Sequence, residues 1–150
     1  MLKEDFWLSG HFKPKRVYEY FPSKRSLSKF PDGITYAKVD IKDFRTINCL
    51  IDNDFKIIET TVFFKQVSIK PVETNSRDYI IRETCEKDRL MVNNIAAGVF
   101  KKSRFYMDEN ISNKIASTIK REWADNFYKG KRGTRLLVCE DSKERVLGFL

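Results

Sequence analysis

The chain has 150 residues, a formal net charge of +8 and an apolar content of 41%. This size suits one ordinary domain, or a small domain with part of another, and supplies enough apolar side chains for a core. No run of about 18 apolar residues is present, which excludes a helix that spans a membrane. The first ten residues carry Glu4 and Asp5 and no apolar signal region, so we expect a cytoplasmic protein without a secretion signal.

The three cysteines, Cys49, Cys85 and Cys139, are odd in number and lie far apart in the chain. This spacing argues against a framework of disulfides and against a zinc site of the C-x-x-C type. We therefore expect three buried, reduced thiols and no metal site.

The excess of positive charge favours a polyanionic partner, such as nucleic acid, a phosphate group or an acidic surface. Residues 1–34 interleave aromatic with basic side chains, a pattern typical of surfaces that bind single-stranded nucleic acid. An irregular segment that packs its rings on a neighbouring sheet has the same pattern. No helix-turn-helix or RNP-type motif accompanies it. Within this stretch, Val17–Phe21 predicts a short strand.

A strand–helix–strand unit is predicted between residues 34 and 65. Ile34–Val39 alternates like a strand, and Asp40 or Asp43 precedes a short helix with apolar side chains on one face. Phe55–Lys65 is rich in β-branched and aromatic residues and predicts a long strand.

The next stretch predicts a linker, a strand and a helix. Residues 68–77 include a proline and several small polar residues, which is typical of a linker. Asp78–Thr84 predicts a strand. Arg89–Phe100 predicts a helix with one buried side, and Asp88 is placed to cap it. Residues 101–108 connect this helix to the next.

The strongest pattern lies between residues 103 and 150. Apolar side chains recur there at every fourth position, which predicts one long helix with a buried face: Ile111, Ile115, Ile119, Trp123 and Phe127. We expect Asp108 to cap this helix, and Gly130 and Gly133 to end it after Lys129. Two short apolar runs around a polar turn, Arg135–Cys139 and Arg145–Leu150, predict a β-hairpin.

This order of elements resembles the first half of an acyl-CoA-dependent N-acetyltransferase of the GNAT superfamily. Ile81, Arg82 and Asp88 match the Ile-Arg-x-x-x-x-x-Asp pattern of the family's first strand. The resemblance is to the branch typified by dTDP-fucosamine acetyltransferase, covers roughly residues 40–150, and includes Ser103-Arg-Phe105, Trp123, Asn126, Gly130, Val146–Phe149 and the accessory-domain strand Asp54-Phe55-Lys-Ile57-Ile-Glu-Thr60.

The resemblance implies an α/β (α+β) fold with two parts. Residues 1–70 would form a small strand–helix–strand accessory domain. Residues 78–150 would form the first half of the acetyltransferase domain, with the order strand–helix–helix–strand–strand. The implied activity is transfer of an acetyl group from acetyl-CoA to an amine, such as an amino-sugar nucleotide.

The family binds acetyl-CoA through a loop of the form Arg/Gln-x-x-Gly-x-Gly/Ala, which follows the next strand of the family and is absent from this chain. We therefore expect an amino-terminal piece of an enzyme, inactive by itself and without catalytic or cofactor-binding residues of its own. In such a piece the strand Val146–Leu150 is an exposed edge, which favours pairing with a second copy of the chain.

The resemblance places acceptor binding in the segment between the first two helices of the acetyltransferase domain. Its residues there are Ser103, Arg104, Phe105 and Tyr106. Arg104 is suited to bidentate contacts with a nucleotide phosphate, and Phe105 or Tyr106 to stacking on a base or sugar ring. The alternatives are core packing for Phe105 and an ion pair with Asp108 for Arg104. For the whole chain, the alternative is a basic, non-enzymatic module that binds nucleic acid or another polyanion.

Overall fold

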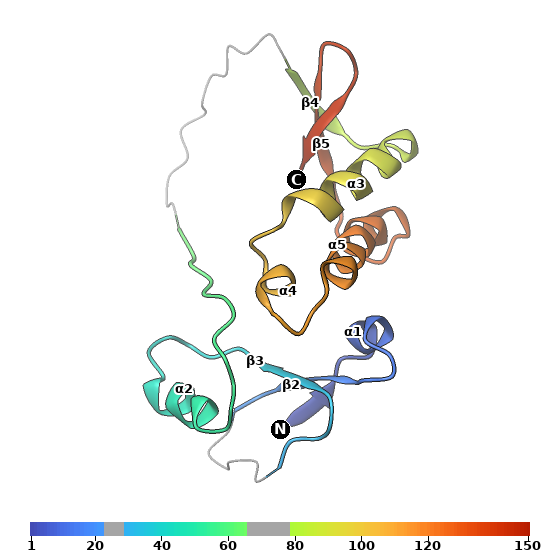
Figure 1. Cartoon of the computed structure of the whole chain (residues 1–150). Coiled ribbons are helices and arrows are strands. Elements are labelled where there is room, and N and C mark those ends of the chain that lie inside the picture. Colours follow the sequence, from blue (N-terminus) through green and yellow to red (C-terminus); the bar gives the residue numbers. More distant parts are fainter. Residues whose placement is uncertain (23–28, 66–78) are drawn as a thin grey trace. The chain divides into compact units, whose positions relative to one another are not determined.

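The computed structural model describes residues 1–22, 29–65 and 79–150 and divides the chain into two compact units, residues 1–58 and residues 59–150 (Figure 1). Each unit combines helices with a small three-stranded sheet, so the chain is a mixed α+β protein, as predicted. The predicted linker over residues 68–77 lies outside the described residues.

The sheet of the amino-terminal unit has the strand order β1–β2–β3. β1 (Leu2–Glu4) is antiparallel to β2 (Val17–Tyr20), and β2 is parallel to β3 (Ile34–Ala37). The strands predicted over residues 17–21 and 34–39 are therefore confirmed, each slightly shortened. Between β1 and β2 lies α1 (Phe6–His11), which begins where the carboxylate of Asp5 accepts a hydrogen bond from the Leu8 N–H, 2.9 Å.

The first residues of the chain are more regular than their sequence suggests. Their apolar side chains form the small core of this unit, which contains the buried residues Leu8, Phe12, Val17 and Tyr20. The Tyr20 ring meets the Phe30 ring edge to face, and Phe30 meets Phe55 in the same way. Several of the interleaved aromatic side chains thus pack inside the unit, whereas Phe6 is exposed.

The predicted helix after β3 is confirmed as α2 (Phe44–Ile51), and Asp43 caps it through a hydrogen bond from the Thr46 N–H. The strand predicted over Phe55–Lys65 is wrong, because this stretch has no strand in the structure. β-branched residues favour a strand only where a neighbouring strand supplies the ladder, and β3 instead pairs with β2. The predicted strand–helix–strand unit is therefore only a strand and a helix, β3 and α2.

The carboxyl-terminal unit contains the predicted strand, two helices and hairpin, with two further short helices. Its elements are β4 (Tyr79–Glu83), a 3₁₀ turn η1 (Glu86–Asp88), α3 (Arg89–Val99), α4 (Arg104–Met107), α5 (Asn113–Tyr128), β5 (Leu137–Asp141) and β6 (Val146–Phe149). The sheet has the order β4–β5–β6, and both pairs are antiparallel. Of the additional elements, α4 lies within the predicted connection over residues 101–108.

The long helix α5 begins one turn later than predicted and ends where predicted. The Ser112 hydroxyl caps it by accepting a hydrogen bond from the Ile115 N–H, so the prediction of Asp108 as the cap is wrong. Asp108 instead accepts from Asn110 in the preceding turn. At the other end Gly130 has a positive φ of 63°, and the Lys131 N–H donates to the Asn126 carbonyl. This pattern satisfies the last carbonyl groups of the helix.

The core of the carboxyl-terminal unit lies where α3 and α5 pack together and against the sheet (Figure 1). Its buried side chains are Val92, Ala96, Phe105, Ala116, Ile119, Ala124, Leu136 and Val138. The sheet also carries exposed apolar side chains, Ile81 on β4 and Leu147 on β6. β6 ends the sheet of the described residues, and the carbonyl and N–H of Leu150 continue its pairing with Leu137.

All three cysteines are free, but the prediction that they are buried is wrong for Cys49 and Cys85, which are exposed. Cys139 is half-buried on β5. Among the described residues, none of the helices combines the length and the apolar character needed to cross a membrane.

We expect Ile119→Ala to lower the free energy of unfolding by about 2–5 kcal/mol, because it empties a fully buried site between the helices and the sheet. Urea unfolding followed by circular dichroism measures this loss. Leu90→Ala is the matched control, since Leu90 lies on α3 but is 73% exposed. Equal losses for the two variants would contradict this assignment of the core.

Candidate functional site

The segment that the sequence selected for acceptor binding forms α4 and its approach. Ser103 has an extended backbone immediately before α4, and its hydroxyl oxygen is buried with no hydrogen-bond partner within the described part of the chain. The backbone carbonyl of Ser103 accepts from Tyr106 and Met107. A buried hydroxyl without a partner is costly, so this oxygen is an exception to the usual satisfaction of buried polar groups.

The two aromatic residues of α4 are used mainly for packing. Phe105 is 4% exposed, and its ring meets the Trp123 ring edge to face, with centroids 5.7 Å apart. The Tyr106 hydroxyl donates to the Ala97 carbonyl, 2.7 Å, and the ammonium of Lys101 lies 4.6 Å from the centre of the Tyr106 ring. The core-packing alternative for Phe105 thus matches its position.

Arg104 lies beside these rings. The carbon atom of its guanidinium is 4.9 Å from the centre of the Phe105 ring, and its backbone N–H donates to the carboxylate of Glu59, 3.0 Å. The guanidinium therefore borders Phe105, one of the aromatic residues that the sequence assigned to the acceptor, and the Glu59 carboxylate contacts the backbone of the same residue.

Lys120 of α5 lies at the centre of these aromatic side chains, and the sequence did not indicate it as a site residue. Lys120 is only 9% exposed. Its ammonium lies 4.7 Å from the centre of the Trp123 ring, 5.1 Å from that of Phe100 and 5.4 Å from that of Phe105. The negative faces of aromatic rings attract a cation, and these three contacts hold the ammonium in a largely apolar setting.

Arg132 adds a third cation. Its guanidinium carbon is 4.8 Å from the centre of the Trp123 ring, the ring that Lys120 also contacts. The positive φ angles of Gly130 and Gly133 shape the turn after α5 that carries Arg132. We call Arg104, Lys120 and Arg132, with the rings of Phe100, Phe105 and Trp123, the cationic cluster.

The electrostatics of the cationic cluster follow from its crowding. Burial lowers the pKa of the Lys120 ammonium, and the positive charges of Arg104 and Arg132 lower it further, while Glu59 acts in the opposite direction. Each of these cations raises the energy of the others, so the cluster has an excess of positive potential. A negatively charged group that entered it would relieve this repulsion.

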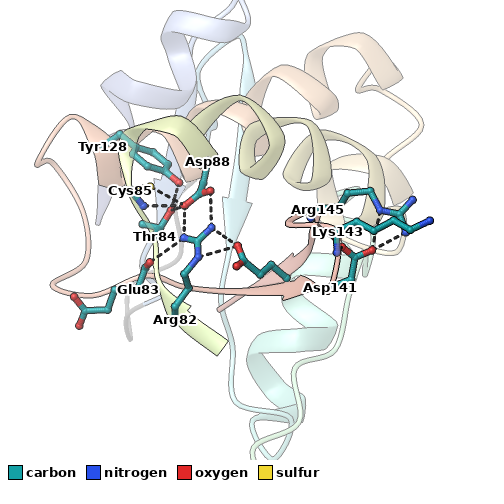
Figure 2. Close-up of polar contacts among 10 residues, drawn as sticks. Arg82, Glu83, Thr84, Cys85, Asp88, Tyr128, Asp141, Lys143 and Arg145 are labelled. Carbon is teal, nitrogen blue, oxygen red and sulfur yellow. Dashed lines mark hydrogen bonds and ion pairs between the residues drawn. The ribbon is translucent and has the colours of Figure 1, made fainter. Parts of the chain in front are cut away.

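A second polar network joins the sheet to the start of α3 (Figure 2). The guanidinium of Arg82 binds both oxygens of Asp88, at 2.6 and 2.9 Å, and its Nε donates to Glu140 at 2.8 Å. Asp88 also accepts from the Cys85 N–H, 2.9 Å. Asp88 stands at the N-cap position of α3, as predicted, but its side chain makes no capping hydrogen bond there, because its carboxylate faces Arg82 and closes the 3₁₀ turn instead.

The remaining carboxylates of this region also hold the fold together. Asp125 of α5 binds Arg89 of α3 at 2.6 Å and accepts from Asn93 at 2.9 Å. In the hairpin turn, Asp141 accepts from the backbone and side chain of Arg145 (Figure 2). These bonds give both carboxylates a structural role.

No family model matches the sequence, and no curated protein matches it either. Among the described residues, no three histidine, cysteine or acidic side chains lie together in a way that could hold a metal ion. The geometry of the cationic cluster and the order of the elements are thus the observations on which a function can be proposed.

The signal for Lys120 was present in the sequence. Ala116, Lys120 and Ala124 lie four residues apart, so they share one side of α5, and the small alanine side chains leave room for the lysine stem to pack. All three are buried. A lysine between two alanines beside a buried face therefore indicates a lysine whose stem is buried.

We expect Asp88→Asn to lower the free energy of unfolding at pH 7 by about 1–3 kcal/mol, because Arg82 loses a charged partner. The hydrogen bond from Arg82 holds the pKa of Asp88 well below its usual range. Such a carboxylate stabilises the fold above pH about 4, and this contribution is lost as the pH falls further.

The difference in the free energy of unfolding between wild type and Asp88→Asn, measured by urea unfolding, should therefore become smaller from pH 5 to pH 2. Glu86→Gln is the control, because the pair of Glu86 with Arg89 is exposed and worth about 0–1 kcal/mol. A difference in free energy that stays constant over this pH range would show that the ion pair of Arg82 with Asp88 is not its cause.

We expect Lys120→Met to raise the free energy of unfolding at pH 7, because it keeps the apolar stem and removes a charge whose pKa is lowered by burial. Wild type loses this penalty as the pH rises through the lowered pKa towards the ordinary value of 10.5, so the advantage of the variant should shrink there. Thermal unfolding between pH 7 and pH 10.5 measures both effects, with the exposed Lys114→Met as control. A variant less stable than wild type at every pH would contradict the expected charge penalty.

Proposed function

We propose that the carboxyl-terminal unit is the acceptor-binding half of an acyl-CoA-dependent N-acetyltransferase of the GNAT type, and that its acceptor is an amino-sugar nucleotide. The observation that carries the proposal is the order of its elements. A strand, two long helices and an antiparallel hairpin follow one another in the order that the sequence resemblance implies, with the first strand pairing with the hairpin.

The position of the cationic cluster supports the same assignment. α4 lies between α3 and α5, where the resemblance places the acceptor, and Arg104 and Ser103 are at its start. Arg104, Lys120 and Arg132 supply positive charge for the phosphate groups of a nucleotide sugar, and the unpartnered hydroxyl of Ser103 suits a hydroxyl or amine of the sugar.

In the proposed reaction the amine of the acceptor attacks the thioester carbonyl, a C–N bond forms, the C–S bond breaks, and the amine proton goes with the thiolate that leaves. This chemistry requires that the amine be held in place and kept neutral. The contribution of this chain is on that acceptor side.

The residues of this chain do not fit acetyl-CoA itself. The family's glycine-rich pyrophosphate loop, which precedes a helix, is not in the sequence, and Gly130 and Gly133 follow the end of a helix instead. No catalytic step through acetyl-CoA is therefore assigned to a residue of this chain.

We expect the 150-residue chain to bind a thymidine-diphosphate-linked amino sugar about tenfold more tightly than thymidine diphosphate, because contacts to the sugar add to those of the phosphates. Isothermal titration calorimetry measures both affinities. Ser103→Ala should weaken binding of the amino-sugar nucleotide about two- to tenfold and leave that of thymidine diphosphate unchanged. Ser142→Ala, in the exposed hairpin turn, is the control.

Equal affinities for the two ligands, or unchanged binding in Ser103→Ala, would refute the acceptor assignment. Tight binding of acetyl-CoA would refute the proposal that this chain contributes only the acceptor side. Binding of a single-stranded oligonucleotide, with a logarithm of affinity that falls linearly with the logarithm of salt concentration, would instead support the basic binding module.

A further inference from the structure

Two cations of the cationic cluster have unusual surroundings. Lys120 and Arg132 contact aromatic rings, and no carboxylate within the described part of the chain lies in ion-pair distance of either. Elsewhere in this unit, Arg82, Arg89 and Arg135 are each paired with an acidic residue. Lys120 and Arg132 are thus held by aromatic rings, whereas these three arginines are held by carboxylates.

We propose that Arg104, Lys120 and Arg132 form a binding site for the phosphate or pyrophosphate group of a small organic ligand. The three side chains come from α4, α5 and the turn after α5, and they surround one group of rings. An ammonium supplies three donors and each guanidinium five, a set that suits the several oxygens of a phosphate group. The site stands independently of acyl transfer, because it recognises charge rather than a reacting group.

The burial of Lys120 points to a small ligand. Only 9% of Lys120 is exposed, whereas a nucleic-acid backbone is usually followed by a row of exposed cations. Phe100 borders the ammonium and is 44% exposed, so it offers an apolar surface next to the charge. This combination fits an organic phosphate, with the ring of Phe100 beside its organic part.

Glu59 acts as a built-in competitor in this site. Its carboxylate accepts from the Arg104 N–H and is the acidic group that raises the pKa of Lys120. Glu59 is exposed, so the contact is weak and exchangeable. A phosphate group carries more negative charge and more acceptor oxygens than this carboxylate, and we expect it to replace Glu59 beside the cations.

Binding of inorganic pyrophosphate and of uridine diphosphate to the full chain tests the site by calorimetry. Lys120→Met should weaken binding of both probes about tenfold or more, and Arg132→Gln about threefold to tenfold, because each removes charged donors. Lys131→Gln is the matched control, since Lys131 is the exposed neighbour of Arg132 in the sequence. Glu59→Gln should strengthen binding about two- to fivefold, as expected for loss of a weak competing contact.

Each result decides a different point. Tighter binding of uridine diphosphate than of pyrophosphate identifies an organic phosphate as the ligand, and equal affinity identifies free phosphate groups. The proposal is overturned if neither probe binds, if Lys131→Gln weakens binding as much as Arg132→Gln, or if an oligonucleotide binds more tightly than both probes. Arg132 is exposed, so Arg132→Gln tests the site with a second variant that leaves the buried residues unchanged. The two proposals can be told apart. If both probes bind as expected here but thymidine diphosphate and its amino-sugar derivative bind equally well, the phosphate site is supported and the acceptor assignment is rejected.

Discussion

The packing of α5 against α3 decides where two charged side chains of the carboxyl-terminal unit lie, those of Lys120 and Asp125. Ile119 and Val138 are fully buried in this contact, and Ala116, Lys120 and Ala124 on the neighbouring side of α5 are also buried. Lys120 occupies that flank, where its stem packs among apolar groups and its ammonium reaches the rings. The same helix holds Asp125, which binds Arg89 across the helix pair. Structural and unpaired charges therefore arise from one packing arrangement.

Most elements could be predicted from the sequence because each has a strong local signal. The four-residue apolar repeat defined α5, and Gly130 fixed its end because a positive φ suits glycine. The run over residues 55–65 failed as a strand for the opposite reason, since a strand needs a partner that local sequence does not specify. The short pieces β1 and α1 were missed because three to six residues carry too little periodicity.

The candidate site was predicted only in part. The sequence resemblance selected Arg104 and Phe105, which both belong to the cationic cluster, but the Phe105 ring is buried in the core and Lys120 was overlooked. Pairs such as Arg82 with Asp88 and Lys120 with Phe100 depend on contacts across different elements, which periodicity within one element does not reveal. The buried alanine–lysine–alanine repeat was the one local sign of the cluster.

The turn after α5 positions a charged side chain through the backbone conformation of an uncharged residue. Gly130 needs no space beyond its backbone, because a Cβ there would meet nothing within 4 Å, yet its φ of 63° is one that other residues adopt at a cost. That conformation directs the chain so that Arg132 returns over Trp123. A residue with no side chain thus sets the course of the segment that carries one of the three cations of the cationic cluster.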